Sequence, residues 1–181
     1  MEFVILGLLA LRAMTVYEIN KALDRGVSLF YNASYGSINA AIGRLLEKGW
    51  ISGQEKVEKG RNKKIFQLTP PGWQAFHDWL NSDIEAEKVK DPGLTRLYFM
   101  GFASAAERIR VLEAHLEKLR HTLDALEYIH LQSTEIETPP DLEDVRRFQL
   151  LTLDYGRAFY AFNIAWYEAL LTTLKTETSD P

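Results

Sequence analysis

Hydrophobic residues recur at helical spacing near the start of the chain and predict two helices there. Residues 3–11 are almost continuously apolar and form the first. Thr15 and Glu18 have the spacing of a capping box, in which each side chain bonds the backbone amide of the other residue. This box opens a second helix that runs to about Arg25, with Ile19 on its apolar stripe.

The third predicted helix starts at Ser34 or Tyr35, ends before Gly49, and has an unusual outward face. Its buried face is marked by Ile38, Ala41, Ile42 and Leu45. The opposite face carries Gly36, Ala40, Gly43 and Glu47. Each glycine costs a helix about 1 kcal/mol relative to alanine. We therefore expect the small residues to serve a purpose, namely to leave a thin face on which a broad surface can approach the helix backbone. A DNA groove and a second packed helix both satisfy this expectation.

Alternation with a period of two residues then predicts two strands, Trp50–Val57 and Lys64–Thr69. The connecting segment, Glu58–Lys64, is predicted as a loop, and it is rich in lysine and arginine. Taken alone, such a loop is most simply a solvated turn. After it, Thr69 is a good N-cap, and two prolines open a fourth helix that runs to about Leu80.

Three helices, a basic hairpin and a further helix occur in the order of a winged helix-turn-helix domain. In that fold the third helix enters the major groove of DNA. The hairpin, or wing, lies along the sugar-phosphate backbone, where lysine and arginine neutralise phosphates. The thin face and the basic hairpin are consecutive in this sequence, and together they favour DNA binding.

Over residues 3–80 the sequence resembles the PadR family of transcriptional regulators. The residues that carry the resemblance are Leu6-Gly-Leu-Leu9, Tyr17-Glu18-Ile19, Gly36-Ser-Ile38, Ala41-Ile42, Arg44-Leu45, Glu47-Lys-Gly-Trp-Ile51, Gly60-Arg61, Lys63 to Phe66, Leu68-Thr69 and Gly72. The resemblance implies a homodimeric transcription factor with a helical C-terminal dimerisation domain and, in some members, an aromatic or cationic effector. Asn39 and Gly43 depart from the residues common in the family, so base contacts are not carried over at these two positions.

The predicted DNA-binding residues lie in the helices and in the wing. Asn39 has the chemistry for a bidentate contact to adenine, and Arg44 for guanine or phosphate. Lysine and arginine in the wing are assigned to phosphates. The full predicted set is Tyr17, Ser34, Tyr35, Ser37, Asn39, Arg44, Lys59, Arg61, Asn62, Lys63 and Lys64.

The C-terminal half has the pattern of long packed helices. Ser104 and Glu107 form a second capping box, and it opens a helix with a heptad seam. The seam residues are Ala105, Ile109, Leu112, Leu116, Leu119, Leu123, Leu126 and His130. Thr138-Pro-Pro-Asp141 breaks the chain before a last helix that runs to about Leu174. Residues 94–102 are predicted to form a short apolar helix that packs between the two halves.

The last helix is apolar on two sides, which predicts a homodimer. One stripe is Phe148, Tyr155, Phe159, Phe162 and Trp166, and the other is Leu153, Tyr160, Ile164, Tyr167 and Leu171. A helix with one face exposed to solvent needs only one apolar stripe, which packs against its own chain. The second stripe is therefore expected to pack against a partner chain. Tyr155, Phe159, Phe162 and Trp166 are also candidates to stack on a small aromatic effector, and ordinary dimer core is the alternative.

Charge divides the chain at the same place as the hydrophobic pattern. The whole chain has a formal net charge of -4, but residues 1–82 hold ten Lys+Arg and seven Asp+Glu, against eleven and eighteen in residues 83–181. The first half is therefore mildly basic and the second acidic, as expected if only the first faces a polyanion. We predict a mainly α protein with a small β-hairpin, in which 1–82 is a winged helix-turn-helix domain and 83–181 a helical dimerisation domain.

Several classes of function are disfavoured. There is no cysteine, which excludes thiolate catalysis and sulfur-ligated zinc. The longest apolar run, Phe3 to Leu11, is about half the length of a membrane span, and a cytoplasmic protein is expected. No catalytic, phosphate-binding or metal motif is present, so neither an enzyme nor a cofactor is predicted. The alternatives are a winged-helix module that binds protein instead of DNA and, less favoured, a helical small-molecule-binding protein.

Overall fold

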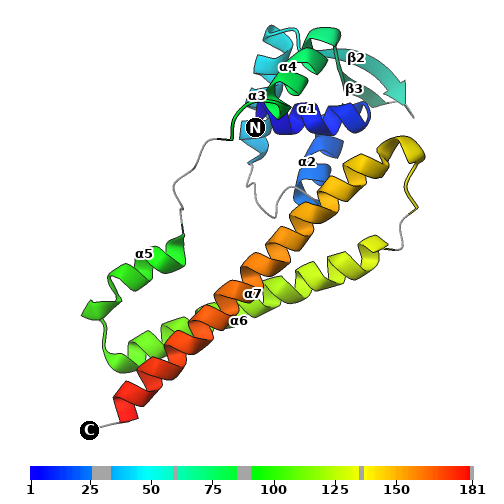
Figure 1. Ribbon diagram of the computed structural model, residues 1–181. Coiled ribbons are helices and arrows are strands. Elements are labelled where there is room, and N and C mark those ends of the chain that lie inside the picture. Colours follow the sequence, from blue (N-terminus) through cyan, green and yellow to red (C-terminus); the bar gives the residue numbers. More distant parts are fainter. Residues whose placement is uncertain (26–33, 59–60, 85–90, 135–136, 180–181) are drawn as a thin grey trace. The chain divides into compact units, whose positions relative to one another are not determined.

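A computed structural model describes residues 1–25, 34–58, 61–84, 91–134 and 137–179. They form two compact units, Met1–Ala86 and Glu87–Pro181, and each is considered by itself. The first unit contains α1 (Glu2–Leu11), β1 (Met14–Thr15), α2 (Val16–Arg25), α3 (Tyr35–Glu47), β2 (Ile51–Glu58), β3 (Arg61–Leu68) and α4 (Pro70–Leu80) (Figure 1). This order confirms the predicted winged helix-turn-helix fold.

The core of the first unit is built on the apolar face of α3. Ile38, Ala41, Ile42 and Leu45 are each at most 5% exposed. They pack against residues of α1, α2 and β3, among them Ile5, Leu6, Leu9, Ile19, Leu23 and Phe66. The predicted buried face of the helix is therefore correct, and its burial fixes which side of α3 points outward.

A glycine turn connects α3 to the wing. Gly49 has a φ of 65°, a left-handed conformation that glycine adopts without steric cost. The amide of Gly49 donates to the carbonyl of Leu46, and the amide of Trp50 donates to that of Leu45. These bonds satisfy the last carbonyls of the helix, and the chain enters β2 directly after it.

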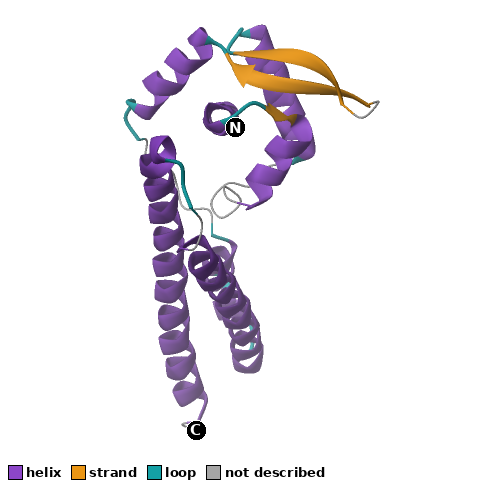
Figure 2. Cartoon of the chain, turned by 90° about the vertical axis from the view of Figure 1, so that its right-hand side faces the viewer, coloured by secondary structure: helices purple, strands orange, loops and turns teal. Residues whose placement is uncertain are grey.

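The sheet is antiparallel, with the strand order β1-β3-β2, and the hairpin is longer than predicted. Pairing continues from Ile51 opposite Leu68 to Glu58 opposite Arg61. The prediction of a loop is therefore wrong for residues 58 and 61–64, which are paired strand, and residues 59–60 lie outside the described residues. At this end the strands are polar on both faces, so they lack the apolar alternation that marks a strand in sequence. Figure 2 shows the hairpin extending beyond the helices of its unit.

The described part of the second unit consists of two long helices and three short helical segments. It contains α5 (Pro92–Tyr98), the 3₁₀ turn η2 (Met100–Phe102), α6 (Ala105–Thr134), the 3₁₀ turn η3 (Pro140–Leu142) and α7 (Glu143–Ser179). Helices α6 and α7 lie side by side in Figures 1 and 2. The predicted capping box is confirmed, since the Ser104 amide donates to Glu107 Oε2 at 2.9 Å.

The predicted helix over 94–102 is corrected by the structure. Asp91 caps α5, because its Oδ1 accepts from the amides of Gly93 and Leu94 at 2.6 and 3.0 Å. The helix therefore starts at Pro92, and it ends at Tyr98, before η2. Met100 is buried in the core of this second unit.

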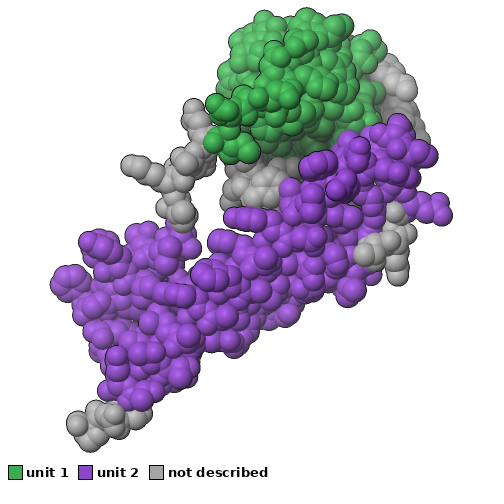
Figure 3. All heavy atoms as spheres, in the orientation of Figure 1, with its two compact units in different colours: residues 1–86 green, residues 87–181 purple. Residues whose placement is uncertain are grey.

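The core of the second unit includes Leu112, Leu116, Tyr167 and Leu171. Figure 3 colours this unit purple. No helix among the described residues has both the length and the hydropathy to cross a bilayer.

Candidate nucleic-acid interface

The first turn of α3 is fixed by hydroxyl groups and carries an exposed tyrosine. Ser34 is the N-cap, and its Oγ accepts a hydrogen bond from the Ser37 amide at 3.2 Å. The Ser37 hydroxyl donates to the Ser34 carbonyl at 2.7 Å. Tyr35, between them, is 63% exposed. Both serines thus stabilise the helix start, and Tyr35 is the large side chain that it offers to a ligand.

The outward face of α3 is uncovered. A Cβ built on Gly36 or on Gly43 meets no other atom within 4 Å. Ala40 and Glu47, on the same face, are exposed. No other described element of the chain packs here, so a second helix of the same chain does not account for the small residues. The thin face is open to a macromolecule.

Asn39, beside the thin face, is held by its own helix. Its Nδ2 donates to the carbonyl of Tyr35 at 3.2 Å. This bond uses one of the two hydrogens of the amide group. The second hydrogen and Oδ1 remain for other contacts, and the bond sets the direction of the side chain along the face.

Arg44 and Lys48 share a carboxylate from the other end of the sequence. Glu2 on α1 accepts from Arg44 Nε and from Lys48 Nζ, each at 2.6 Å. The two hydrogen bonds, from Lys48 first and then Arg44, lower the pKa of Glu2. Sequence reasoning did not identify Glu2, because it lies 42 residues from Arg44 and no local pattern connects them. In the unliganded chain the predicted base-reading arginine therefore already has a carboxylate partner, which it shares with Lys48.

The paired strands of the wing carry several lysines. Lys63 lies opposite Lys56 across the hairpin, and Lys64 lies opposite Glu55. Lys63 and Lys64 are exposed, and the Lys64 ammonium lies 5.7 Å from the centre of the Phe66 ring. Lys59 lies outside the described residues, as do the side chains of Arg61 and Asn62.

Tyr17 stands at the start of α2, the helix before α3, and is 72% exposed. The neighbouring Glu18 completes the predicted capping box, since its Oε2 accepts from the Thr15 amide at 2.9 Å. That bond, followed by the one from Arg12, lowers the pKa of Glu18 to about 2. The start of α2 is thus capped by side-chain hydrogen bonds, and α2 and α3 each present an exposed tyrosine in the first turn. Helix N-termini attract phosphate groups.

The four predicted effector residues lie on α7 but do not together line one cavity. Tyr155 is 71% exposed and Phe162 67% exposed. Tyr155 stacks on Phe159 with ring centres 6.4 Å apart, and Trp166 packs edge-on to Tyr167 at 5.0 Å. Phe159 lines a cavity of about 580 Å³ between α5, α6 and α7, and the other three residues do not line that cavity. No cluster of metal-binding side chains occurs in the described part of the chain.

The two units correspond to two known protein families. Residues 5–78 match the model of the transcriptional regulator PadR-like family. Residues 89–175 match the model described as virulence activator alpha C-term.

Whole-length relatives share both units. The chain is 25% identical over 178 residues to the negative transcriptional regulator PadR of Bacillus subtilis, a match that covers 96% of this chain and 97% of that protein. The crystal structure of B. subtilis PadR in complex with operator DNA superposes with a TM-score of 0.83, at 24% identity, and covers 96% of this chain and 98% of that one. B. subtilis PadR in complex with p-coumaric acid gives a TM-score of 0.78, at 23% identity, with 96% and 94% covered.

Proposed function

Because this chain belongs to the PadR-like family of transcriptional regulators, we propose that it binds an operator as a homodimer and represses transcription from it. The observation that carries the proposal is the uncovered face of α3, with Gly36 and Gly43 open to space, in the same unit as an extended basic wing. Because three of the four residues on this face, Gly36, Ala40 and Gly43, are small, the helix backbone can come close to the floor of the major groove. Repression is supported by the name of the relative from B. subtilis.

Contacts to DNA divide into positioning and reading. The exposed Tyr17 and Tyr35 and the wing residues Lys63 and Lys64 meet phosphates, which set affinity and register. Lys59, Arg61 and Asn62 extend this contact in the wing, and Ser34 and Ser37 hold the start of α3 in place. Asn39 reads adenine through the amide edge that its helix leaves available.

Arg44 reaches DNA by exchanging partners. In the free chain its Nε is bonded to Glu2 at 2.6 Å. A phosphate or guanine must therefore compete with this carboxylate, which also holds Lys48. We expect the competition to weaken binding to all sequences, so that good contacts elsewhere on α3 are needed for stable binding.

Homodimerisation is supported by the exposed stripe on α7. Leu153, Tyr167 and Leu171 of the second stripe are buried within the chain. Phe148, Tyr155, Phe159, Phe162 and Trp166 are 41–71% exposed. A second copy covers such a surface by the same patch on both chains. Two α3 helices then read an inverted repeat with half-sites about one turn of DNA apart.

A small aromatic effector is also proposed. The support is the relative that has been crystallised with p-coumaric acid. An effector shifts the operator-binding state only if it binds one state of the dimer better than the other.

The wing assignment is tested by the salt dependence of binding. Replacing Arg61, Lys63 and Lys64 with alanine removes about three phosphate contacts, so the slope of log K against log salt should fall by about 2.7. Fluorescence anisotropy with a labelled duplex measures it. A control with Arg120, Arg147 and Lys175 replaced changes the net charge equally in the other unit and should leave the slope near that of the wild type.

An unchanged slope in the wing variant would refute the wing contact. Binding of neither protein to any duplex in dilute buffer would favour a winged-helix module that binds protein.

A further inference from the structure

The first turn of α1 is not held by a side-chain cap. Its N-cap residue is Met1, whose side chain makes no capping hydrogen bond, whereas Ser34 and Thr69 cap α3 and α4. The start of a helix frays unless caps or packing hold it. This turn carries Glu2, the carboxylate that accepts from Arg44. Whatever fixes the turn therefore also fixes the carboxylate.

Aromatic rings from three parts of the first unit meet at this turn. Phe3, the neighbour of Glu2, stacks on Trp79 of α4 with ring centres 5.1 Å apart and planes only 3° apart. The Phe3 ring also meets Trp50, directly before β2, with centres 6.0 Å apart. Helix α4 packs against α1 (Figure 1). Packing of aromatic rings thus takes the place of a cap.

The ring cluster and the ion cluster share a second contact at Lys48. The Lys48 ammonium lies 4.5 Å from the centre of the Trp50 ring and 2.6 Å from Glu2 Oε2. The Glu2 side chain is only 18% exposed, so it has little room to leave its partners while the turn stays in place. The position of the carboxylate therefore depends on the rings beside it.

We propose that Trp79 is a positioning residue, whose stack on Phe3 fixes the first turn of α1 and thereby acts on the DNA-binding cations. The fixed turn keeps Glu2 on Arg44 and Lys48. A carboxylate that is already held in place loses less freedom when it pairs, so the stack strengthens the competitor that DNA must displace. The proposal deepens the proposed function, on which it rests only for the consequence for DNA binding.

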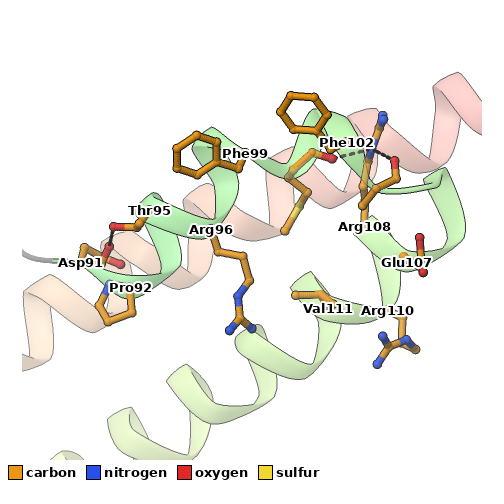
Figure 4. A pocket seen from close by; sticks show the side chains of 12 residues that line it. Asp91, Pro92, Thr95, Arg96, Phe99, Phe102, Glu107, Arg108, Arg110 and Val111 are labelled. Atoms are coloured by element: carbon orange, nitrogen blue, oxygen red, sulfur yellow. Dashed lines mark hydrogen bonds between the residues drawn. The ribbon is translucent and has the colours of Figure 1, made fainter.

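Trp79 lies in the last turn of α4, close to the point where the chain leaves the first unit. Residues 81–90 separate α4 from Asp91, which caps α5 in the second unit (Figure 4). Trp79 is 42% exposed, so its ring can leave the stack without opening the core. Displacement of this turn should release Glu2 as loss of the ring does.

NMR spectroscopy of the free full chain tests the positioning without DNA. The hydrogen bonds from Lys48 and then Arg44 lower the pKa of Glu2. Trp79→Leu should raise this pKa toward its ordinary value and shift the Arg44 Nε–Hε signal toward that of a solvated arginine. Leucine keeps an apolar side chain over α1, so the variant should fold. Trp79→Phe retains a ring and should stay near the wild type in both signals.

Trp73 provides the matched control on the same helix. It is also 42% exposed, and like Trp79 it contacts Phe76; its other ring contact is with His77. Trp73→Leu should lower the melting temperature about as much as Trp79→Leu but leave the Glu2 pKa unchanged. A Glu2 pKa that is equal in the wild type and in Trp79→Leu would overturn the proposal.

Fluorescence anisotropy with a random-sequence duplex measures the consequence for DNA binding. Trp79→Leu should tighten binding about threefold, the range of a partly exposed ion pair, because Arg44 and Lys48 become available to phosphates. The gain should vanish in the Glu2→Gln background, where no carboxylate is left to position. A purely structural role lowers stability and does not tighten binding.

Tighter binding by Trp73→Leu as well, or a gain that persists in the Glu2→Gln background, would also overturn the proposal. Failure of the wild type to bind any duplex would overturn the proposed function instead, and the NMR measurement would still decide whether Trp79 positions Glu2.

Discussion

The dimer proposal predicts that Phe162→Ala separates the two copies. Phe162 is 67% exposed in the single chain, and a phenylalanine has about 200 Å² of surface, so about 130 Å² is left for a partner. At about 25 cal/mol per Å², truncation removes about 3 kcal/mol of apolar burial from each chain. A two-fold dimer contains the residue twice, so the sum is about 6 kcal/mol, or about a ten-thousandfold weaker dissociation constant.

Buried area overestimates the free energy of association. If truncation of both copies costs only half of this sum, about 3 kcal/mol, the dissociation constant of the dimer still rises about a hundredfold. Sedimentation equilibrium across a range of concentrations measures the dissociation constant. Tyr35→Ala is the matched control, because Tyr35 is an aromatic of similar exposure, 63%, in the other unit. It should leave the dimer intact and weaken DNA binding. A dimer equally stable with and without the Phe162 ring would refute the assignment of the stripe.

Four further variants test the first unit. Gly36→Ala and Gly43→Ala should each raise the free energy of unfolding by about 1 kcal/mol, because each added Cβ meets open space. Both should weaken DNA binding, because the added methyl group keeps the helix farther from the groove. A variant that is more stable and binds DNA equally well would contradict this role of the two glycines. Glu2→Gln should free Arg44 and Lys48 and tighten binding to random-sequence duplexes, measured by fluorescence anisotropy. The gain should shrink with Arg44→Ala and vanish when Lys48 is also replaced by alanine, and unchanged binding in Glu2→Gln would contradict the competition. Glu18 has its pKa lowered from 4.5 to about 2, so its contribution is complete above pH 4.5 and lost as the pH falls toward 2. The Glu18 side chain is 37% exposed, which reduces the expected effect to about 1 kcal/mol. In urea titrations the wild type should lose about this much more free energy of unfolding between pH 4.5 and pH 2 than Glu18→Gln does. Equal pH profiles of the two proteins would contradict the role of this carboxylate.

Local signals account for most of the fold. The two capping boxes, the Thr69 cap and the apolar face of α3 depend on residues within one or two turns of each other, and each has the predicted role in the structure. The outward face of α3 follows from the same helical geometry. Heptad spacing likewise predicts the packing of α6 on α7.

Features that depend on distant residues could not be predicted. Strand β1 has two residues, too few for a period, and exists because Met14 pairs with Phe66. Glu2 reaches Arg44 only after α1 has packed in the core. The lining of a cavity of about 580 Å³ in the second unit includes Gly93, His115 and Tyr167, which have no common spacing in the sequence. Residues 56–58 and 61–63 of the wing form strands because their backbones pair across the hairpin. Their sequence, rich in polar residues, is typical of a loop and gave no strand signal.

Selection of bound duplexes from random DNA by the 181-residue chain decides whether it binds an operator as a dimer. An operator-binding dimer should enrich an inverted repeat whose half-sites lie about one helical turn apart, and Asn39→Ala should lose the preference at one position per half-site. Enrichment of no sequence, or of a single unrepeated site bound by one chain, would contradict it.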